Sequence, residues 1–339
     1  MKNIDWKNLP FSYMKTHANV RCYFKDGQWS KPDLCESDEI CIPIASTCLH
    51  YGQECFEGLK AYMGKDGRIR LFRWQENARR MARSAKGILM AEVPESLFYQ
   101  AIQLAVKNNI EFVPPYGTGA TLYIRPLLIG VSPILGVKPS TEYIFIIFVS
   151  PVGPYFKDGF LPGNYYICRE YDRAAPLGTG NIKVGGNYAA SLRSLEYAHE
   201  KHYTSVIYLD AKEKKYIDEC GPSNFFGIKN NTYITPKSNS ILPSITNMSL
   251  MELAKDMGMK VEVRPIPLDE LESFEEAGGC GTATVISPIR KIIDEANNKV
   301  YEFGKDNKPG PLSVKLYNRL TAIQFGDEPD PFGWITFVE

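Results

Sequence analysis

The chain has 339 residues, 44% of them apolar, which is enough for two domains that each bury a core of their own. Lysine plus arginine and aspartate plus glutamate number 39 each, so the charge balance gives no reason to expect a nucleic acid or an anionic membrane surface as partner. The chain has no apolar run of the ~20 residues that a membrane helix needs, no secretory signal and no CxxC pair among its eight cysteines, so we expect a cytoplasmic, reduced protein.

The first half of the chain predicts strands mixed with two helices. IRLFRW (69–74) is predicted as a strand, and residues 76–89 as a helix because their apolar positions recur every three or four residues. A second helix is expected over 94–108. TLYIRPLLIGV (121–131) and EYIFIIFVS (142–150) then predict strands, since both are rich in β-branched and aromatic residues.

The stretch SPVGPYFKDGFLPGN (150–164) is dense in proline and glycine, which is typical of a loop between domains. Strands are predicted beyond it near 165–170, 205–209, 215–218, 224–229 and 232–235, and helices near 188–201 and 246–257. Because strands and helices alternate without a regular βαβ rhythm, we expect an α+β fold in both halves. The expected division is one domain over 1–155, a linker over 156–162 and a second domain over 163–339.

A glycine-rich segment, GTGNIKVGGNYAASL (178–192), places Lys183 just ahead of a predicted helix. Either the loop cradles a phosphate that the lysine pairs with, or the amine itself does covalent chemistry; a solvated lysine is the plainer alternative. A Walker loop is excluded because Gly-Lys-Ser/Thr is missing, and a dinucleotide fingerprint fails because no strand runs directly into the loop. Glycines allow a bulky planar ligand to approach the backbone, and a suitably activated lysine attacks carbonyl groups.

Three further segments supply what a Schiff-base lysine and a phosphorylated aldehyde cofactor would require. YIDECGPSNFFGI places Glu219 at the end of a strand, where a carboxylate could keep a pyridine nitrogen protonated. SILPSITNMSLMELA places Ser244, Ile245 and Thr246 at a helix start, which is suited to a phosphate ester. EEAGGCGTATVISP adds a turn with the hydroxyls of Thr282 and Thr284.

With these motifs the chain resembles the branched-chain amino-acid aminotransferases, of the fold type IV, class IV family of pyridoxal-phosphate-dependent enzymes, and in particular their larger subgroup. The resemblance runs from residue 51 to near the C-terminus. It rests on these segments: YGQECFEGLKAY, RMARSA, YIRPLLIG, SPVGPYF, KVGGNYAASL, ECGPSNFF, ILPSIT, GTATV and QFGDEPD. It implies a small N-terminal α/β domain and a larger C-terminal domain that carries the cofactor lysine on a barrel-like sheet with surrounding helices.

The resemblance implies pyridoxal 5′-phosphate as the cofactor and assigns a role to each motif. Lys183 would form the internal aldimine and shuttle a proton between the substrate Cα and the cofactor C4′. Tyr188 would hydrogen-bond the cofactor's phenolic oxygen, and Glu219 would pair with its pyridine nitrogen. The phosphate would be held by Arg80, Ile245, Thr246 and Thr282.

The same resemblance implies transfer of an amino group between L-leucine, L-isoleucine or L-valine and 2-oxoglutarate, by a ping-pong mechanism in branched-chain amino-acid metabolism. An apolar side-chain pocket would be lined by Phe11, Tyr51, Phe56 and Tyr188. Tyr123 and Arg125 would lie at its polar end, with the backbone at Thr282 and Ala283 receiving the α-carboxylate. Leu135 and Val137 would close the pocket of a neighbouring subunit, so a homodimer is expected, and no metal is implied.

Three positions depart from the family pattern. Asn247 stands where a basic residue commonly follows the phosphate turn, and Pro222 where a threonine is frequent near the substrate. The redox CxxC of some members is replaced by Thr284-Val285-Ile286-Ser287. The alternatives are a D-amino-acid aminotransferase or an aminodeoxychorismate lyase of the same fold, and a catalytically silent phosphate-ligand binding protein.

Overall fold

The computed structural model describes residues 4–154, 160–304 and 306–339. It divides into two compact units, of which the first comprises Met1–Tyr155, Ile182–Gly185 and Ala322–Glu339, and the second Phe156–Asn181 and Gly186–Thr321. Part of the predicted linker, and the predicted boundary with it, falls on residues 155–159, outside the described residues. The domain limits given by the sequence therefore stay a prediction.

The segment that carries Lys183 groups with the first unit, although the sequence assigned this lysine to the domain over 163–339. The physical reason is burial of its two apolar side chains. Ile182 and Val184 are 6% and 5% exposed and belong to the hydrophobic core of the first unit. Lys183 lies between these two buried side chains, which attach its segment to the first unit.

The first unit is built on an antiparallel sheet, in which nine strands belong to the described residues. Their order is β18-β6-β5-β7-β8-β1-β2, while β3 pairs with β1 and β4 with β7. The strands are β1 (Asn19–Lys25), β2 (Gln28–Trp29), β3 (Asp33–Cys35), β4 (Glu54–Phe56), β5 (Leu59–Met63), β6 (Ile69–Phe72), β7 (Thr121–Gly130), β8 (Tyr143–Val152) and β18 (Ile335–Phe337).

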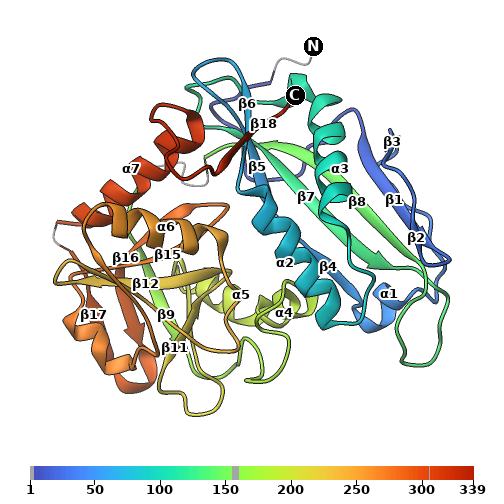
Figure 1. Cartoon of the computed structure of the whole chain (residues 1–339). Coiled ribbons are helices and arrows are strands. Elements are labelled where there is room, and N and C mark those ends of the chain that lie inside the picture. The colour runs from blue at the N-terminus through green and yellow to red at the C-terminus, as the bar shows by residue number, and fades with distance from the viewer. Residues whose placement is uncertain (1–3, 155–159, 305) are drawn as a thin grey trace. The chain divides into compact units, whose positions relative to one another are not determined.

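Helices α2 (Trp74–Gly87) and α3 (Glu95–Lys107) cover one face of this sheet (Figure 1). Successive residues of a strand point to opposite faces. On β7 the buried Leu122 and Ile124 therefore join the core beneath the helices, and Tyr123 and Arg125 lie on the opposite face. The short helices of this unit are α1 (Thr47–Tyr51) and η1 (Ile110–Phe112).

The second unit contains a closed sheet. The strand path β11-β10-β9-β16-β15-β12 returns to its start because β11 also pairs with β12, which closes a ring of six strands. This confirms the predicted barrel-like sheet. The strands of the unit are β9 (Gly163–Cys168), β10 (Ser205–Leu209), β11 (Ile217–Cys220), β12 (Ser223–Lys229), β13 (Thr232–Thr235), β14 (Lys260–Val263), β15 (Glu276–Gly281), β16 (Val285–Asp294) and β17 (Lys299–Glu302).

The helix predicted over 188–201 is instead two helices, α4 (Gly185–Ala190) and α5 (Leu192–Glu200). The helix ladder is interrupted at Ser191, where the backbone N–H and the side-chain hydroxyl both donate to the carbonyl of Tyr188. The other helices are α6 (Ile245–Asp256), α7 (Pro311–Phe325), η2 (Leu268–Ser273) and η3 (Glu295–Asn297).

Helix α6 begins where the sequence predicted. Ser244 is its N-cap and accepts a hydrogen bond from the Asn247 N–H. Within the described residues, no helix combines the length and the apolar character needed to cross a membrane. The same residues contain no cluster of three or more His, Cys, Asp or Glu side chains arranged for a metal ion.

Candidate active site

The main chain of Lys183 is held on both sides by neighbouring elements of the first unit. Its N–H donates to the Ser84 hydroxyl on α2 at 2.9 Å, and its carbonyl accepts the Phe56 N–H of β4 at 3.1 Å. Two residues on, the Gly185 N–H donates to the Glu54 carboxylate. The lysine amine lies 4.8 Å from the centre of the Phe56 ring. Lys183 therefore has a fixed backbone and an aromatic neighbour, a preorganised setting that is compatible with a lysine that binds a cofactor covalently.

Glu54 is a half-buried acid beside this lysine segment. Burial raises the pKa of its carboxyl, against the opposing effects of the Gly185 N–H and the Arg125 charge. A side chain at position 185 would overlap the Glu54 carboxylate. Gly185 thus allows the Glu54 carboxylate to approach the backbone, and a side chain here would have to displace that carboxylate.

Arg80 forms a buried ion pair with Glu57. The guanidinium donates from Nε to Oε1 at 2.6 Å and from Nη2 to Oε2 at 2.7 Å, and Asn77 adds a bond of 2.8 Å. Burial alone would raise the pKa of the Glu57 carboxyl, but the Arg80 charge and hydrogen bonds, with the Lys183 charge, outweigh it and lower the pKa. Glu57 thus fixes the orientation of the arginine that the sequence assigned to a phosphate.

The predicted substrate residues of the first unit form a continuous chain of contacts. Arg125 donates from Nη2 to the Tyr123 hydroxyl at 3.1 Å, and its guanidinium lies over the Phe56 ring at 4.9 Å. The Tyr123 ring meets Phe11 edge-on, with ring centres 5.4 Å apart. Arg125 Nε is buried and has no hydrogen-bond partner among the described residues. An unsatisfied guanidinium donor beside aromatic rings suits an anionic ligand with an apolar side chain.

The loop after β7 carries two almost fully exposed apolar side chains. Leu135 and Val137 are 91% and 87% exposed. The Tyr51 hydroxyl donates to the carbonyl of Leu135 in the same chain, so the predicted pocket residue Tyr51 contacts this loop directly.

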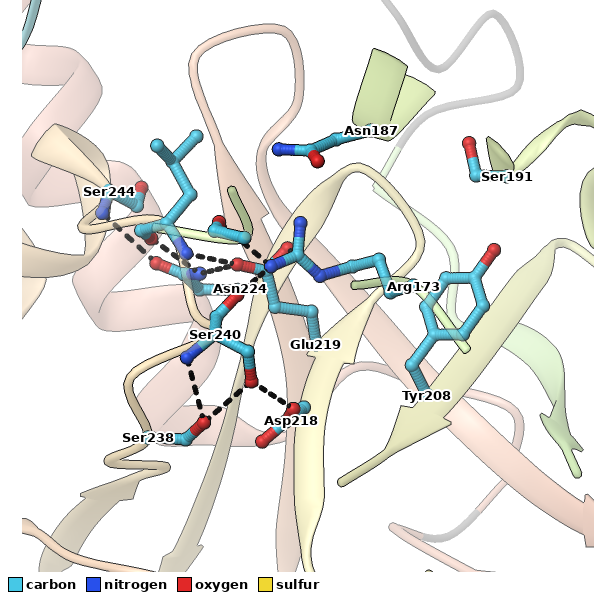
Figure 2. Close-up of polar contacts among 12 residues, drawn as sticks. Arg173, Asn187, Ser191, Tyr208, Asp218, Glu219, Asn224, Ser238, Ser240 and Ser244 are labelled. Carbon is cyan, nitrogen blue, oxygen red and sulfur yellow. Dashed lines mark hydrogen bonds and ion pairs between the residues drawn. The ribbon is translucent and has the colours of Figure 1, made fainter. Parts of the chain in front are cut away.

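Glu219 (Figure 2) lies on β11 in the second unit. The turn of Gly221 and Pro222 follows it and joins β11 to β12. The Glu219 carboxylate is buried, at 3% residue exposure. Oε1 accepts the Leu242 N–H at 2.6 Å and the Asn224 amide at 3.2 Å, and Oε2 lies 3.3 Å from Arg173 Nε. These donors fix the direction of the acid that the sequence assigned to a ring nitrogen.

The N-terminus of α6 offers backbone donors within the same unit. Ile245 and Thr246 occupy its first turn and are buried. Asn247, the departure from the family pattern, turns its side chain into the core, where it accepts from the Tyr233 hydroxyl and donates to Thr235. An anion at this helix start would therefore be bound by backbone N–H groups and the helix dipole, without a charged side chain from position 247.

The turn at 282–284 joins β15 to β16 and is strained. Val285, which follows it, has φ of 64°, a left-handed conformation that is rare for a β-branched residue. Thr282 and Ala283 are half-buried, and the buried Thr284 hydroxyl has no hydrogen-bond partner among the described residues. A strained turn with an unsatisfied hydroxyl is typical of a ligand site.

Tyr188 lies on α4, half-buried, and its neighbour Asn187 fixes the glycine-rich loop. Thr179 donates from its hydroxyl to Asn187 Oδ1 at 2.8 Å, and Asn187 Nδ2 donates back to the Thr179 carbonyl at 2.7 Å. This reciprocal pair joins the start of α4 to the segment before Lys183.

These residues fit a phosphorylated aldehyde such as pyridoxal 5′-phosphate. The helix start at Ile245 and the unsatisfied Thr284 hydroxyl suit a phosphate or carboxylate, and the buried Glu219 suits a protonated ring nitrogen. In the first unit, Lys183 would supply the amine. The folds of the two units and these groups, each taken within its own unit, are those expected of a class IV aminotransferase.

The comparisons agree with this class. Residues 54–292 match the family "Amino-transferase class IV", and the chain belongs to this family. It is 51% identical to the branched-chain-amino-acid aminotransferase of Haemophilus influenzae over 346 residues, covering 100% of both chains. It is 48% identical to the enzyme of the same name from Helicobacter pylori, covering 99% of this chain and 98% of the relative.

Solved structures of the same name share the fold. The Escherichia coli branched-chain amino acid aminotransferase superposes with a TM-score of 0.78 at 25% identity, covering 95% of this chain and 100% of that one. The T.th. enzyme with pyridoxamine 5′-phosphate gives 0.79 at 25% identity, covering 96% and 100%. The predicted fold type IV architecture and the family assignment are confirmed.

Sequence reasoning missed the residues that hold the predicted ones. These are Glu54, Glu57, Ser84, Arg173 and Asn224. Glu54 and Glu57 stand in the quoted motif GQECFEG, and Asn224 in ECGPSNFF. Their roles depend on partners that are distant in the sequence, and no rule of residue spacing predicts such a pair. The signal that was available is that a lysine or arginine inside an apolar core requires an acid.

Proposed function

We propose that this protein is a pyridoxal-phosphate-dependent transaminase that exchanges the amino group between L-leucine, L-isoleucine or L-valine and 2-oxoglutarate. The proposal rests on Lys183, whose main chain is held by hydrogen bonds at both its N–H and its carbonyl and whose amine lies beside the Phe56 ring. The substrate class is supported by the names of the relatives that span the whole chain. For the same reason a D-amino-acid aminotransferase or an aminodeoxychorismate lyase is not favoured.

Pyridoxal 5′-phosphate, when bound, supplies an aldehyde that exchanges between amines and a ring that withdraws electrons. The Lys183 amine would hold the aldehyde covalently and, once displaced by substrate, remove the Cα proton and return it to C4′. Glu219 would keep the proton on the ring nitrogen, and Tyr188 would hydrogen-bond the phenolic oxygen. The phosphate would be held by Arg80, Ile245, Thr246 and Thr282.

The proposed substrate contacts divide by polarity. Phe11, Tyr51, Phe56 and Tyr188 would surround a branched apolar side chain, which gains free energy by leaving water. Tyr123 and the backbone near Ala283 would bind the α-carboxylate. Arg125, whose Nε has no hydrogen-bond partner among the described residues, would take the second carboxylate of 2-oxoglutarate.

A homodimer belongs to this proposal, with Leu135 and Val137 of one subunit completing the pocket of the other. It is supported by the exposure of these two side chains, 91% and 87%, since large apolar groups that protrude together commonly meet a partner. Localisation in the cytoplasm stays a prediction from the sequence.

The proposal is tested by reconstituting the purified protein with pyridoxal 5′-phosphate and recording its absorbance and its substrate profile. We expect a near-ultraviolet to visible band that is absent from Lys183→Ala and present in the control Lys201→Ala, which changes an exposed lysine at the end of α5. L-Leucine should transaminate with 2-oxoglutarate. Activity confined to D-alanine and aminodeoxychorismate, or full activity of Lys183→Ala, would overturn the proposal.

A further inference from the structure

Arg173 is a largely buried cation beside the carboxylate of Glu219 (Figure 2). Its side chain is 9% exposed and that of Glu219 is 4% exposed, with 3.3 Å between Arg173 Nε and Glu219 Oε2. The guanidinium is anchored at its other end, where Nη2 donates to the carbonyls of Gly180, at 2.9 Å, and Ser240. Two backbone carbonyls from separate loops thus hold the positive charge in place.

The contact between the two side chains is electrostatic more than directional. Arg173 Nε lies close to the carboxylate but has no hydrogen-bond partner among the described residues, so its N–H is not aimed at Oε2. Directional hydrogen bonds reach the other oxygen, Oε1, from Leu242 and Asn224. The arginine therefore adds charge to the site while the backbone and the amide fix the orientation.

Asn224 joins this carboxylate to the start of α6. Its amide donates to Glu219 Oε1 and to the Leu242 carbonyl at 3.0 Å, and its Oδ1 accepts the Ser244 N–H at 3.1 Å. Asn224 therefore links the Glu219 carboxylate and the turn that leads into α6 in one hydrogen-bond network.

Besides Arg173, three titratable side chains of the second unit lie near Glu219. Asp218 precedes it on β11, and burial raises the pKa of that carboxyl, against the opposing effects of Ser240, Ser238 and the Arg173 charge. Cys220 on β11 and Cys280 on β15 are buried thiols; burial raises the pKa of Cys220 well above its usual value and that of Cys280 to about 12. Both thiols are neutral near pH 7.

A buried carboxylate that loses its cation takes up a proton, because the charged form is no longer compensated in a medium of low polarity. If Glu219 pairs with a pyridine nitrogen, that proton would come from the ring. The ionic pair of carboxylate and pyridinium would become a neutral pair of carboxylic acid and pyridine, and the number of protons would stay the same.

We infer that Arg173 is a positioning residue which keeps Glu219 ionised, so that the shared proton resides on the cofactor's ring nitrogen. The inference rests on the proposed function and deepens it, because it names the group that sets the electron demand of the ring. It concerns no substrate contact. Arg173 acts only through Glu219.

The test uses the whole protein reconstituted with pyridoxal 5′-phosphate labelled with ¹⁵N in the ring. The ¹⁵N chemical shift distinguishes pyridinium from pyridine without any turnover. We expect pyridinium at pH 7 in the wild type and pyridine in Arg173→Gln. Arg173→Lys keeps a charge but lacks the guanidinium whose Nη2 donates to two carbonyls. The ring nitrogen of this variant should therefore deprotonate about one pH unit or more below that of the wild type.

The matched control is Arg169→Gln, which breaks another ion pair of the second unit. Arg169 donates to the buried Asp294 at 3.0 and 2.6 Å. This variant should lower the melting temperature and leave the ¹⁵N titration unchanged. If Arg173→Gln does not fold, the comparison of wild type with Arg173→Lys decides alone.

Equal titration midpoints in the wild type and the folded Arg173 variants would overturn the inference. Failure of the proposed function gives a different result: the wild-type protein would bind no cofactor, or Glu219→Gln would leave the ring nitrogen protonated as in the wild type. In either case Glu219 would not be the partner of the ring, whatever Arg173 does.

Discussion

Glu57 receives two parallel hydrogen bonds from the guanidinium of Arg80, at 2.6 and 2.7 Å, where both side chains are buried. Glu57 lies in the segment between β4 and β5, and Arg80 on α2. A bidentate pair of this kind fixes the plane of the guanidinium as well as its position. The arginine is thus oriented before any ligand arrives.

Replacing Glu57 by glutamine should destabilise the protein by about 3–5 kcal/mol, because it removes the carboxylate that pairs with the buried Arg80 charge. Glu76→Gln is the control, since Glu76 pairs with the exposed Arg79 on the same helix and should cost no more than about 1 kcal/mol. Chemical denaturation of both variants measures the difference. Equal losses would show that the buried pair contributes no more than the exposed one.

The pH dependence gives an independent check on this pair. The pKa of Glu57 is lowered in the folded state, mainly by Arg80 against burial, so its contribution to stability is complete above the unfolded pKa of ~4.3. It is lost as the pH falls through the lower folded value. The stability difference between wild type and Glu57→Gln should be constant from pH 7 to 5 and shrink below it.

Lys60 predicts a pH effect of the same direction in a different, alkaline range. It lies on β5, 8% exposed, and burial lowers its pKa to about 8. Between pH 8 and the unfolded value of ~10.4 the unfolded chain binds more protons than the folded one, so the free energy of unfolding rises with pH, by up to ~3 kcal/mol. Lys60→Met should lack this rise. Parallel stability curves over this range would contradict the prediction.

The sequence predicted best those features that are set locally. The strands at 205–209 and 232–235 have the bounds expected, because runs of β-branched and aromatic residues are read within a few positions. The start of α6 was predicted from the segment Ser244-Ile245-Thr246. The Ser244 hydroxyl caps this helix by accepting a backbone N–H of its first turn. The cofactor lysine, the acid and the phosphate turn are predicted from motifs of the same short range and stay predictions.

What the sequence did not predict depends on distant partners. Strand β15 is rich in glycine, which disfavours strands, yet a side chain at Gly278 would overlap the Phe226 ring of β12, so the glycine makes room for packing inside the closed sheet. Arg173 and Glu219 are 46 positions apart by residue number, and no local pattern relates them. Which residues form a buried ion pair depends on the tertiary structure, which brings distant segments together, and not on any local motif.

Ser84 should control the position of Lys183. Its hydroxyl accepts the Lys183 N–H and donates to the Arg80 carbonyl, both at 2.9 Å. Ser84→Ala leaves a partly buried N–H unsatisfied, at a cost of about 1–3 kcal/mol. It also removes one of the two hydrogen bonds described for the Lys183 main chain, so kcat should fall about tenfold or more.

The control for Ser84 is Ser46→Ala. Ser46 is equally buried, and its hydroxyl donates to the carbonyls of Pro43 and Val131. This variant should lose a similar amount of stability and keep kcat. A kcat that is unchanged in Ser84→Ala, measured on cofactor-saturated protein, would show that Lys183 is positioned without this hydroxyl.

Gly58 leaves the space that the Tyr123 hydroxyl occupies. A methyl group at position 58 would overlap that oxygen, which accepts the hydrogen bond from Arg125. Gly58→Ala should therefore displace the hydroxyl and raise the KM for the amino-acid substrate, with a smaller change in kcat. Tyr123→Phe removes the same hydroxyl without moving the ring. Because both changes act on one group, the double variant should be no worse than the more severe single one. Steady-state kinetics of the four proteins measure this, and additive losses would mean that Gly58 acts through something other than Tyr123.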